Sequence, residues 1–365
     1  MDKIPITKCK AFALTIPTEA TESDGTLEWN STTLALVQIC ADGIWGLGYT
    51  YCQHGVVPLI ENLLQAHVAG QNILELPRIW GNLTTAVRNN GRQGFSAMAI
   101  SAIDNALWDL KAKILKISMT DLLGRCREQV EVYGSGGFTS QTLPELQQQM
   151  QSWKSQGIRY FKMKVGTHPD QDARRVHFVR ECIGPDNTLM VDANEAYDSV
   201  LALKLAEEFA KDQVSWFEQP VRATDLNAMH ELRQRLPIGM RLTSGEYIYE
   251  LAQVKNLLRM RSTDVIQLDV TRCQGVSGFL KAAAVCEAFD VSISSHCALA
   301  LHVALGCALP GMLQLEYFYD HARIENLIFD GVPQVQNGFL KANSSALGFG
   351  LTLKADEIKR WQTWN

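Results

Sequence analysis

The sequence lacks the charge pattern of proteins that bind nucleic acids or anionic membranes. It has no basic excess, because 34 Lys and Arg stand against 39 Asp and Glu, which gives a formal net charge of −5. Proteins that bind polyanions usually show a basic excess. We therefore expect neither nucleic acid nor a membrane as a partner.

Membrane spans, a leader peptide and a disulfide framework are not indicated either. The longest apolar stretch, 293–315, is interrupted by two histidines and by Pro310-Gly311, which favours a buried strand, loop and helix. The first residues show no apolar run followed by a small-residue cleavage site. The nine cysteines form no C-x-x-C pair, and their odd number prevents complete internal pairing. These features predict a cytoplasmic protein with reduced thiols.

The 365 residues, 46% of them hydrophobic, suffice for two domains, or for one large barrel with an addition. In the first part, Ile4–Ile16, Thr32–Cys40 and Ile44–Thr50 are rich in apolar and β-branched residues, which predicts strands. The polar stretch Thr18–Asn30 contains Asp24-Gly25 and is too long for a two-residue hairpin, so we interpret it as a mobile loop.

A helix is predicted over Phe95–Ile117, where apolar residues recur at steps of three and four. Asp104 and Asp109 fall outside this stripe, which places them on the polar side. Together with the strands, this helix predicts an N-terminal α+β capping domain over residues 1–127.

From residue 128 to 339, eight short apolar runs alternate with helix-like segments. This repetition predicts an α/β fold, a parallel (β/α)8 barrel of the TIM type. The stretch Gly134-Ser-Gly-Gly-Phe does not match the G-x-G-x-x-G turn of a dinucleotide-binding sheet. The tail, 340–365, is expected to return and pack on the capping domain. The runs are Val130–Gly134, Tyr160–Val165, Thr188–Val191, Val214–Phe217, Met240–Thr243, Val265–Leu268, Val291–Ile293 and Met312–Leu315.

Polar residues recur where these runs end, which in a barrel is the face that carries active sites. Each of them alone is more simply explained as a solvated turn residue or a satisfied core residue. Independent surface charges, however, have no reason to recur at the same phase of seven successive repeats. The residues are Lys162, Lys164, Asp192, Asn194, Glu218, Glu246, Asp269, His296 and Glu316.

Three of these residues predict a metal site. Asp192, Glu218 and Glu246 follow three neighbouring strands, and without a cation they would repel one another. Oxygen ligands alone suit Mg2+, whereas zinc would call for Cys or His. Asn194 could add an oxygen or an amide hydrogen bond.

The remaining ring residues suit proton transfer next to a carboxylate. A lysine beside a metal and a second lysine can lose its proton near neutral pH, which would make one of Lys162 and Lys164 a base. Asp269 can orient His296 as a second base or acid. The metal and one lysine would stabilise the enediolate that forms when the α-proton leaves, and a protonated Glu316 could donate a hydrogen bond to it.

These motifs resemble the enolase superfamily, specifically its mandelate racemase subgroup, over nearly the whole chain. The resemblance implies that Asp192, Glu218 and Glu246 bind Mg2+ and that Lys164 and the His296–Asp269 pair act on opposite faces of the substrate. It further implies that Lys162 and Glu316 contact the substrate carboxylate. A homo-oligomer is usual for such folds. The motifs are Phe161-Lys-Met-Lys-Val-Gly, Val191-Asp-Ala-Asn, Phe217-Glu-Gln-Pro, Ser244-Gly-Glu, Gln267-Leu-Asp and Ser295-His, with the helix motif Ala99-Ile-Ser-Ala-Ile-Asp-Asn-Ala-Leu-Trp-Asp-Leu.

The resemblance favours dehydration of an acid sugar to a 2-keto-3-deoxy acid, and racemisation or epimerisation of a 2-hydroxy acid is the alternative. Substrate contacts are expected from Asn194 and from two capping loops, through Trp29, Tyr51 and His54. A sugar-acid binding protein and a metal-dependent hydrolase are two further classes. The first would not need both bases, and the second would not need the two lysines.

Overall fold

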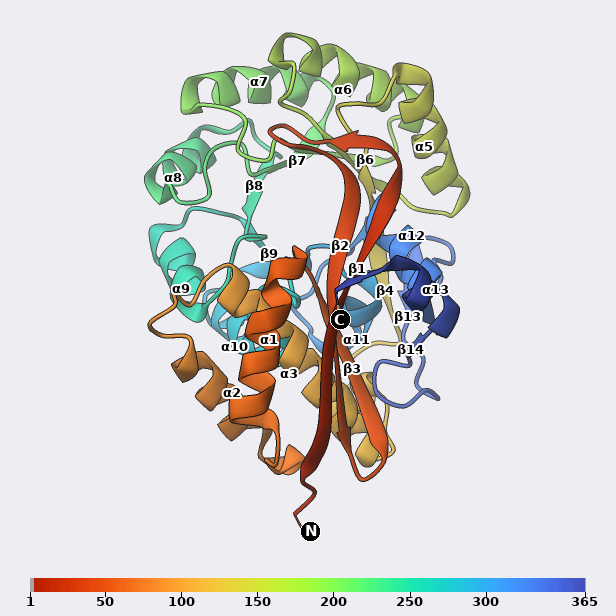
Figure 1. Cartoon of the computed structure of the whole chain (residues 1–365). Coiled ribbons are helices and arrows are strands. Elements are labelled where there is room, and N and C mark those ends of the chain that lie inside the picture. Colours follow the sequence, from red (N-terminus) through yellow and green to blue (C-terminus); the bar gives the residue numbers. More distant parts are fainter. Residues whose placement is uncertain (1–2, 365) are drawn as a thin grey trace.

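The computed structural model describes residues 3–364, so Met1, Asp2 and Asn365, which the predicted domain bounds include, lie outside the described residues. Figure 1 shows a ring of strands and helices with a long antiparallel hairpin lying across it. The chain from β1 to α4 (Met119–Leu123) forms the hairpin sheet and its helices, and the chain from β4 onward forms the ring.

The ring is a parallel barrel of eight strands, each followed by a helix, as the sequence predicts. The strand order is β10-β9-β8-β7-β6-β5-β4-β11, and all of these ladders are parallel. The ring closes where Leu313 N donates to Ile293 O at 2.9 Å and Ile293 N donates to Gly311 O at 3.1 Å. The strands are β4 (Gln129–Gly136), β5 (Tyr160–Lys164), β6 (Thr188–Asp192), β7 (Val214–Glu218), β8 (Arg241–Ser244), β9 (Val265–Leu268), β10 (Ser292–Ser295) and β11 (Leu315–Phe318).

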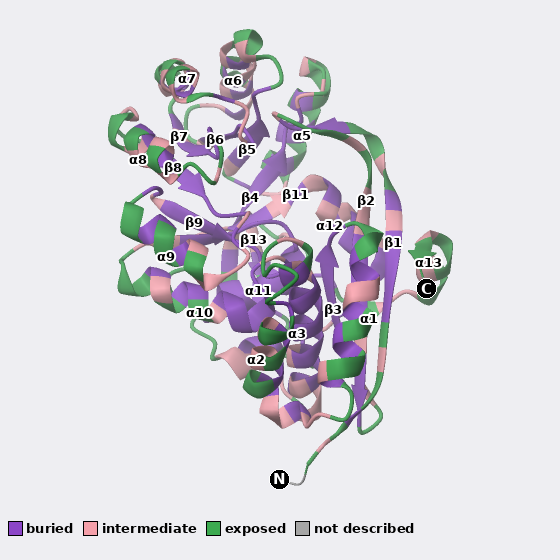
Figure 2. Cartoon of the chain, turned by 60° about the vertical axis from the view of Figure 1, so that its left-hand side comes forward, coloured by how far each residue is buried: buried purple, intermediate pink, exposed green. Residues whose placement is uncertain are grey.

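The barrel helices follow local sequence signals closely. For example, α5 begins with a capping box, because Thr142 and Glu145 exchange hydrogen bonds between side chain and backbone. In Figure 2 the barrel strands are buried and the outer faces of α6 to α9 are exposed. The helices are α5 (Leu143–Ser155), α6 (Pro169–Ile183), α7 (Ser199–Lys211), α8 (Leu226–Arg235), α9 (Leu251–Met260), α10 (Gly275–Ala288), α11 (Leu299–Ala308) and α12 (Tyr319–Ile328).

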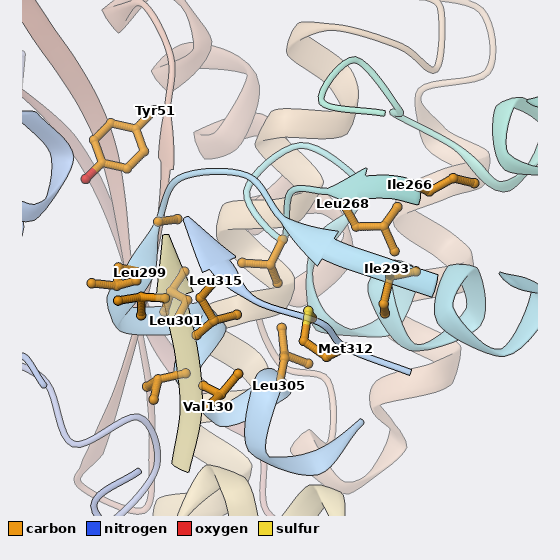
Figure 3. Close-up of a cluster of buried hydrophobic side chains, with 14 of the residues drawn as sticks. Tyr51, Val130, Ile266, Leu268, Ile293, Leu299, Leu301, Leu305, Met312 and Leu315 are labelled. Carbon is orange, nitrogen blue, oxygen red and sulfur yellow. The ribbon is translucent and has the colours of Figure 1, made fainter. Parts of the chain in front are cut away.

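The main core lies between the strands and the helices. Figure 3 shows part of it, where side chains of β4, β9, β10, α11 and β11 face one another. A second, smaller cluster inside the barrel contains Tyr133, Met190, Trp216 and Val265, which close the barrel beneath its mouth. The barrel is therefore a packed body, and a site can form only at its end.

The prediction of a mobile loop over Thr18–Asn30 is wrong. These residues continue β1 (Ile6–Ser23) and β2 (Glu28–Ala41), and a tight turn joins them where Asp24 N donates to Leu27 O. The hairpin tip is held by the barrel, since Ser23 Oγ lies 2.6 Å from Thr139 Oγ1 and Thr26 Oγ1 donates to Asn194 O. Contacts between distant parts of the chain thus override the polar composition.

The placement of Asp104 and Asp109 on a polar face is also wrong, because both are buried in α3 (Phe95–Ile114). Asp104 accepts hydrogen bonds from Ser277 N and Ser277 Oγ, both at 2.8 Å. Asp109 accepts from Leu47 N and Phe349 N, each also at 2.8 Å. Asp104 therefore satisfies a backbone amide group in the first turn of α10, which has no partner within that helix.

The remaining elements complete the capping region and the tail. Within the tail, β13 pairs with β4 of the barrel, whereas β15 pairs with β1 of the hairpin, so the tail contacts both units. None of the helices within residues 3–364 combines the length and apolarity needed to cross a bilayer. The elements are β3 (Ile44–Tyr51), α1 (Val57–Leu63), α2 (Leu76–Ala86), β12 (Phe329–Asp330), β13 (Phe339–Lys341), β14 (Thr352–Leu353), α13 (Ala355–Trp361) and β15 (Gln362–Trp364), with short 3-10 turns at His54–Val56 and Ile73–Glu75 and a π turn at Leu64–Val68.

Candidate active site

The strand register places the predicted site residues side by side. Lys164 on β5 is paired with Asp192 on β6, and Asp192 is paired with Glu218 on β7. Each of the three is the last residue of its strand, so their side chains gather at the carboxyl end of the barrel. Lys162 is two residues earlier on β5 and is paired with Met190 of the interior cluster, which places it one layer deeper.

Lys162 is a buried cation held between two carboxylates. Its Nζ lies 2.8 Å from Glu218 Oε2 and 2.7 Å from Glu316 Oε1, and its side chain is 1% exposed. Burial disfavours the charged amine, but Glu218 and Glu316 outweigh burial and raise the pKa of Lys162 well above its usual value. Lys162 therefore carries a fixed positive charge.

Lys164 and Asp192 form a second buried pair, with Nζ 2.5 Å from Oδ2. Burial opposes the charge on Lys164, but Asp192 outweighs it and raises the pKa of the amine. The amine is therefore protonated in this arrangement, and loss of its proton beside a metal stays a prediction. The same carboxylate accepts a hydrogen bond from Asn194 N at 3.0 Å, and Asn194 Nδ2 donates to Glu246 Oε1 at 3.4 Å.

His296 lies between two carboxylates on the other side of the mouth. Its Nδ1 lies 2.8 Å from Asp269 Oδ2, and its Nε2 lies 2.8 Å from Glu246 Oε2. Thr271 donates to Asp269 through both its amide and its hydroxyl group, each at 2.7 Å, which fixes the carboxylate behind the ring. Burial disfavours the imidazolium, but acidic groups around the ring, including Cys297, Glu246 and Asp269, raise the pKa of His296 well above its ordinary value.

The chain after His296 adopts a backbone that orients Glu316. Cys297 and Ala298 have φ values of 50° and 42°, which is the left-handed region that such residues rarely adopt. This turn aims Cys297 N at Glu316 Oε2, at 2.7 Å. Burial raises the pKa of Glu316, but Lys162 outweighs it and holds that pKa below its usual range. In this arrangement Glu316 is an ionised acceptor, and its protonation beside a bound substrate stays a prediction.

Asp192, Glu218 and Glu246 fit a hard divalent cation. All three are buried, come from or directly follow neighbouring strands, and offer only oxygen ligands. Asn194 Oδ1 is buried close by without a hydrogen-bond partner among residues 3–364. His296, Cys297 and Glu316 also place their nitrogen, sulfur and oxygen atoms within 4.8 Å of one another. This second trio includes an imidazole and a thiol, which a hard cation such as Mg2+ does not favour.

A cavity of about 720 Å³ opens over these groups. Lys164, Glu246 and His296 line it from the barrel, together with the four residues that the sequence suggested for substrate contacts. Those four are Trp29 on β2, Tyr51 on β3, His54 in the turn after β3, and Asn194 after β6.

Family comparisons agree with this geometry. Residues 145–358 match the family model described as enolase C-terminal domain-like, and residues 18–124 match that of the mandelate racemase / muconate lactonizing enzyme N-terminal domain. The chain belongs to the mandelate racemase/muconate lactonizing enzyme family.

Relatives within this family include acid-sugar enzymes. The chain is 30% identical to L-talarate/galactarate dehydratase of Salmonella typhimurium over 88% of this chain and 80% of that one. It is 32% identical to D-galactarolactone cycloisomerase of Agrobacterium fabrum over 72% and 70%.

Solved structures of the family have the same fold. A mandelate racemase/muconate lactonizing enzyme-like protein from Rubrobacter xylanophilus superposes with a TM-score of 0.96 at 42% identity, covering 98% of this chain and all of that one. A racemase from Streptomyces coelicolor with bound magnesium superposes with a TM-score of 0.92 at 27% identity, covering 98% of this chain and 100% of that one.

The structure of this family member adds residues that the sequence did not reveal. Arg272 lines the cavity, donates to the Glu246 carbonyl oxygen at 3.1 Å, and lies 3.6 Å from a carboxylate oxygen of both Glu246 and Asp269. The sequence feature that could have identified Arg272 is its position three residues after Asp269, because a cation just beyond the end of β9 lies at the same end of the barrel as the other site residues. Asp24, His321 and Thr363 also line the cavity. No local pattern marks them, because β1, α12 and the tail meet only in the folded chain.

Proposed function

We propose that the protein removes the α-proton of a carboxylate substrate with the help of Mg2+, and that the reaction is dehydration of an acid sugar to a 2-keto-3-deoxy acid. The observation that carries this proposal is that Lys164 and His296 line one cavity from opposite parts of the barrel mouth. Between them stand the three buried carboxylates. The dehydratases among the relatives support the reaction class.

The two bases approach the cavity from different directions. Strands β4 and β11 separate β5 from β10 on one side of the ring, and β6 to β9 separate them on the other. A substrate between them presents one face to Lys164 Nζ and the other to His296 Nε2. One group takes the α-proton. When a β-hydroxyl group is present, the other protonates it as the C–O bond breaks, and the enol product then tautomerises to the keto acid.

The charges around the two bases are arranged for this proton transfer. Asp269 holds Nδ1 of His296, so Nε2 is the atom that exchanges a proton with the substrate. Asp192, Glu218 and Glu246 would hold Mg2+, which supplies positive charge beside the substrate carboxylate when it is bound. Lys162 adds a second, permanent positive charge below them.

Racemisation or epimerisation of a 2-hydroxy acid is the second candidate. It requires the same two bases, but the opposite base returns a proton to the α-carbon. Cycloisomerisation, which the relative from Agrobacterium fabrum suggests, begins with the same proton removal. All three reactions therefore share one testable step.

The test measures deuterium incorporation at the α-carbon in D2O and keto-acid release with semicarbazide, over a panel of mono- and diacid sugars with Mg2+. We expect exchange to persist in one of the single variants, Lys164→Ala or His296→Asn, namely the one that keeps the group facing the α-proton, and to vanish in the double variant. Keto acid identifies dehydration, whereas exchange with an inverted product identifies racemisation.

Matched controls are available on the surface of the protein. Lys204 on α7 is exposed, His230 on α8 is half-buried, and neither lines the cavity, so Lys204→Ala and His230→Asn remove the same chemical groups away from it. Both should leave exchange unchanged. Undiminished exchange in the double variant of Lys164 and His296 would refute the assignment of the bases.

A further inference from the structure

The two walls of the cavity differ in charge, and this difference indicates how many carboxylate groups the substrate carries. The barrel wall carries Lys164 and Arg272, the two lysine or arginine residues among the described residues that line the cavity. Both already face site carboxylates, Lys164 that of Asp192 and Arg272 those of Glu246 and Asp269. Positive charge is thus concentrated at the end where the reacting carboxylate would bind.

The opposite wall is built from neutral hydroxyl groups. Thr15 on β1, Thr33 on β2 and Thr363 on β15 meet there, with Thr15 Oγ1 3.0 Å from Thr33 Oγ1 and 3.1 Å from Thr363 Oγ1. Ser31 and Thr32 extend the same surface. Hydroxyl groups both donate and accept hydrogen bonds, so this wall matches the hydroxyl groups of a sugar chain.

No unpaired cation stands behind this wall among the described residues. Asp320 accepts a hydrogen bond from Thr32 Oγ1 at 2.7 Å, and Glu325 accepts one from Tyr51 at 3.3 Å. The nearby Arg323 is paired with Asp320 at 2.6 Å, so it is not available as a counter-ion. A second carboxylate placed here would therefore find no positive partner.

The histidines of the wall supply no permanent cation either. The ring of His321 stacks on Tyr51 with centroids 3.5 Å apart, and its Nδ1 is buried without a hydrogen-bond partner among the described residues. Burial lowers the pKa of His321 to about 3, so the ring is neutral and suited to a hydroxyl group. His54 is exposed and stacks on Trp364 with centroids 5.6 Å apart.

We propose that the substrate is a monocarboxylic acid sugar, with an uncharged hydroxylated carbon at its far end, and that a diacid with a second carboxylate there is rejected. This inference rests on the proposed function. A carboxylate enclosed without a counter-ion loses its hydration and gains no partner. A terminal CH2OH group instead finds hydroxyl partners on the threonine wall.

The test compares acids that differ only at the far carbon, gluconate with glucarate and galactonate with galactarate. Keto-acid release and calorimetric binding are measured with Mg2+ at pH 8, above the ordinary range of imidazole titration. In each pair of which at least one member is a substrate, we expect kcat/KM and affinity to be higher for the monoacid than for the diacid by about tenfold or more. Equal or better values for the diacids overturn the inference.

A charge inserted at the wall gives a second measurement. Thr363 is exposed to solvent, so Thr363→Arg adds a cation to the cavity without disturbing the core. We expect it to shift the ratio of kcat/KM values towards the diacid by about tenfold. Thr352→Arg adds the same charge at an exposed position on β14 outside the cavity lining and should leave the ratio unchanged. An unchanged ratio in Thr363→Arg also overturns the inference.

The outcomes separate this inference from the function on which it rests. Keto-acid release from diacids alone contradicts the monoacid assignment and leaves the dehydratase function standing. Absence of both α-exchange and keto acid across the whole panel overturns the proposed function, and the monoacid assignment is overturned with it.

Discussion

The contact between the hairpin tip and the barrel makes Gly25→Ala an informative perturbation. A Cβ atom added at Gly25 would lie 2.1 Å from Ala193 O and 2.7 Å from Val165 O. Both are backbone atoms beside the site, so they cannot move aside as a flexible side chain would. The tip itself must therefore retreat, by about 1 Å if the shorter contact is to reach a tolerable distance.

This retreat would displace groups that line the cavity. Asp24 is the neighbour of Gly25, and Trp29 follows on the same hairpin. The tip would also lose its hydrogen bonds to the barrel, such as the one that Thr26 Oγ1 donates to Asn194 O at 3.1 Å. Misplacement of substrate-positioning groups by 1 Å costs up to about 100-fold in rate. We expect kcat/KM to fall by about 10- to 100-fold.

The assay measures steady-state keto-acid release together with hydrogen exchange of the peptides that cover 18–30 and 136–142. Exchange should rise in both, because Thr139 N donates to Ser23 O across this contact. The midpoint of global unfolding should change little, since the tip lies at the end of the hairpin. Gly81→Ala is the matched control, because nothing lies within 4 Å of a Cβ atom there. If Gly25→Ala keeps the wild-type kcat/KM and the wild-type hydrogen exchange in both peptides, the contact between the hairpin tip and the barrel does not position the cavity, and the reasoning is refuted.

Three further predictions concern charge. Chelation with EDTA should abolish activity and added Mg2+ should restore it, whereas activity that survives exhaustive chelation contradicts the three-carboxylate site. Arg272→Met should raise the Mg2+ concentration for half-maximal activity by about 10- to 100-fold, because Glu246 loses the guanidinium group that orients it through its carbonyl oxygen, and an unchanged Mg2+ titration argues against this role. Burial raises the pKa of Asp104 from 3.8 to about 7, so the stability that the neutral carboxyl group provides is present below pH 4 and is lost as the pH rises through 7. Asp104→Asn should therefore flatten the fall in unfolding free energy between pH 5 and 8, a fall of at most about 3 kcal/mol, and a urea series in which both proteins keep the same slope with pH contradicts it.

The barrel and its ring of polar residues could be predicted because both follow from patterns of residues that are close together in the sequence. An apolar run followed by a polar residue repeats along the chain, and a barrel brings all such ends to one face. The hairpin over Thr18–Asn30 could not be predicted in this way, because Ser23 and Thr139 are 116 positions apart. Asp104 was misplaced for a related reason: its partner, Ser277 at the start of α10, lies 173 positions away.

The two lysines of β5 show where sequence reasoning ends and the fold is needed. A spacing of two residues places both on the same face of the strand but does not distinguish between them. In the structure Lys162 is enclosed by Glu218 and Glu316, whereas Lys164 lines the cavity. In the proposed function, Lys164 is therefore the lysine that exchanges a proton with the substrate, and Lys162 contributes the charge that it places beneath the carboxylates. The two lysines differ because Lys162 lies one layer of side chains deeper in the barrel than Lys164. This depth follows from how β5 is paired with β6 and not from the residue type, which is the same at both positions.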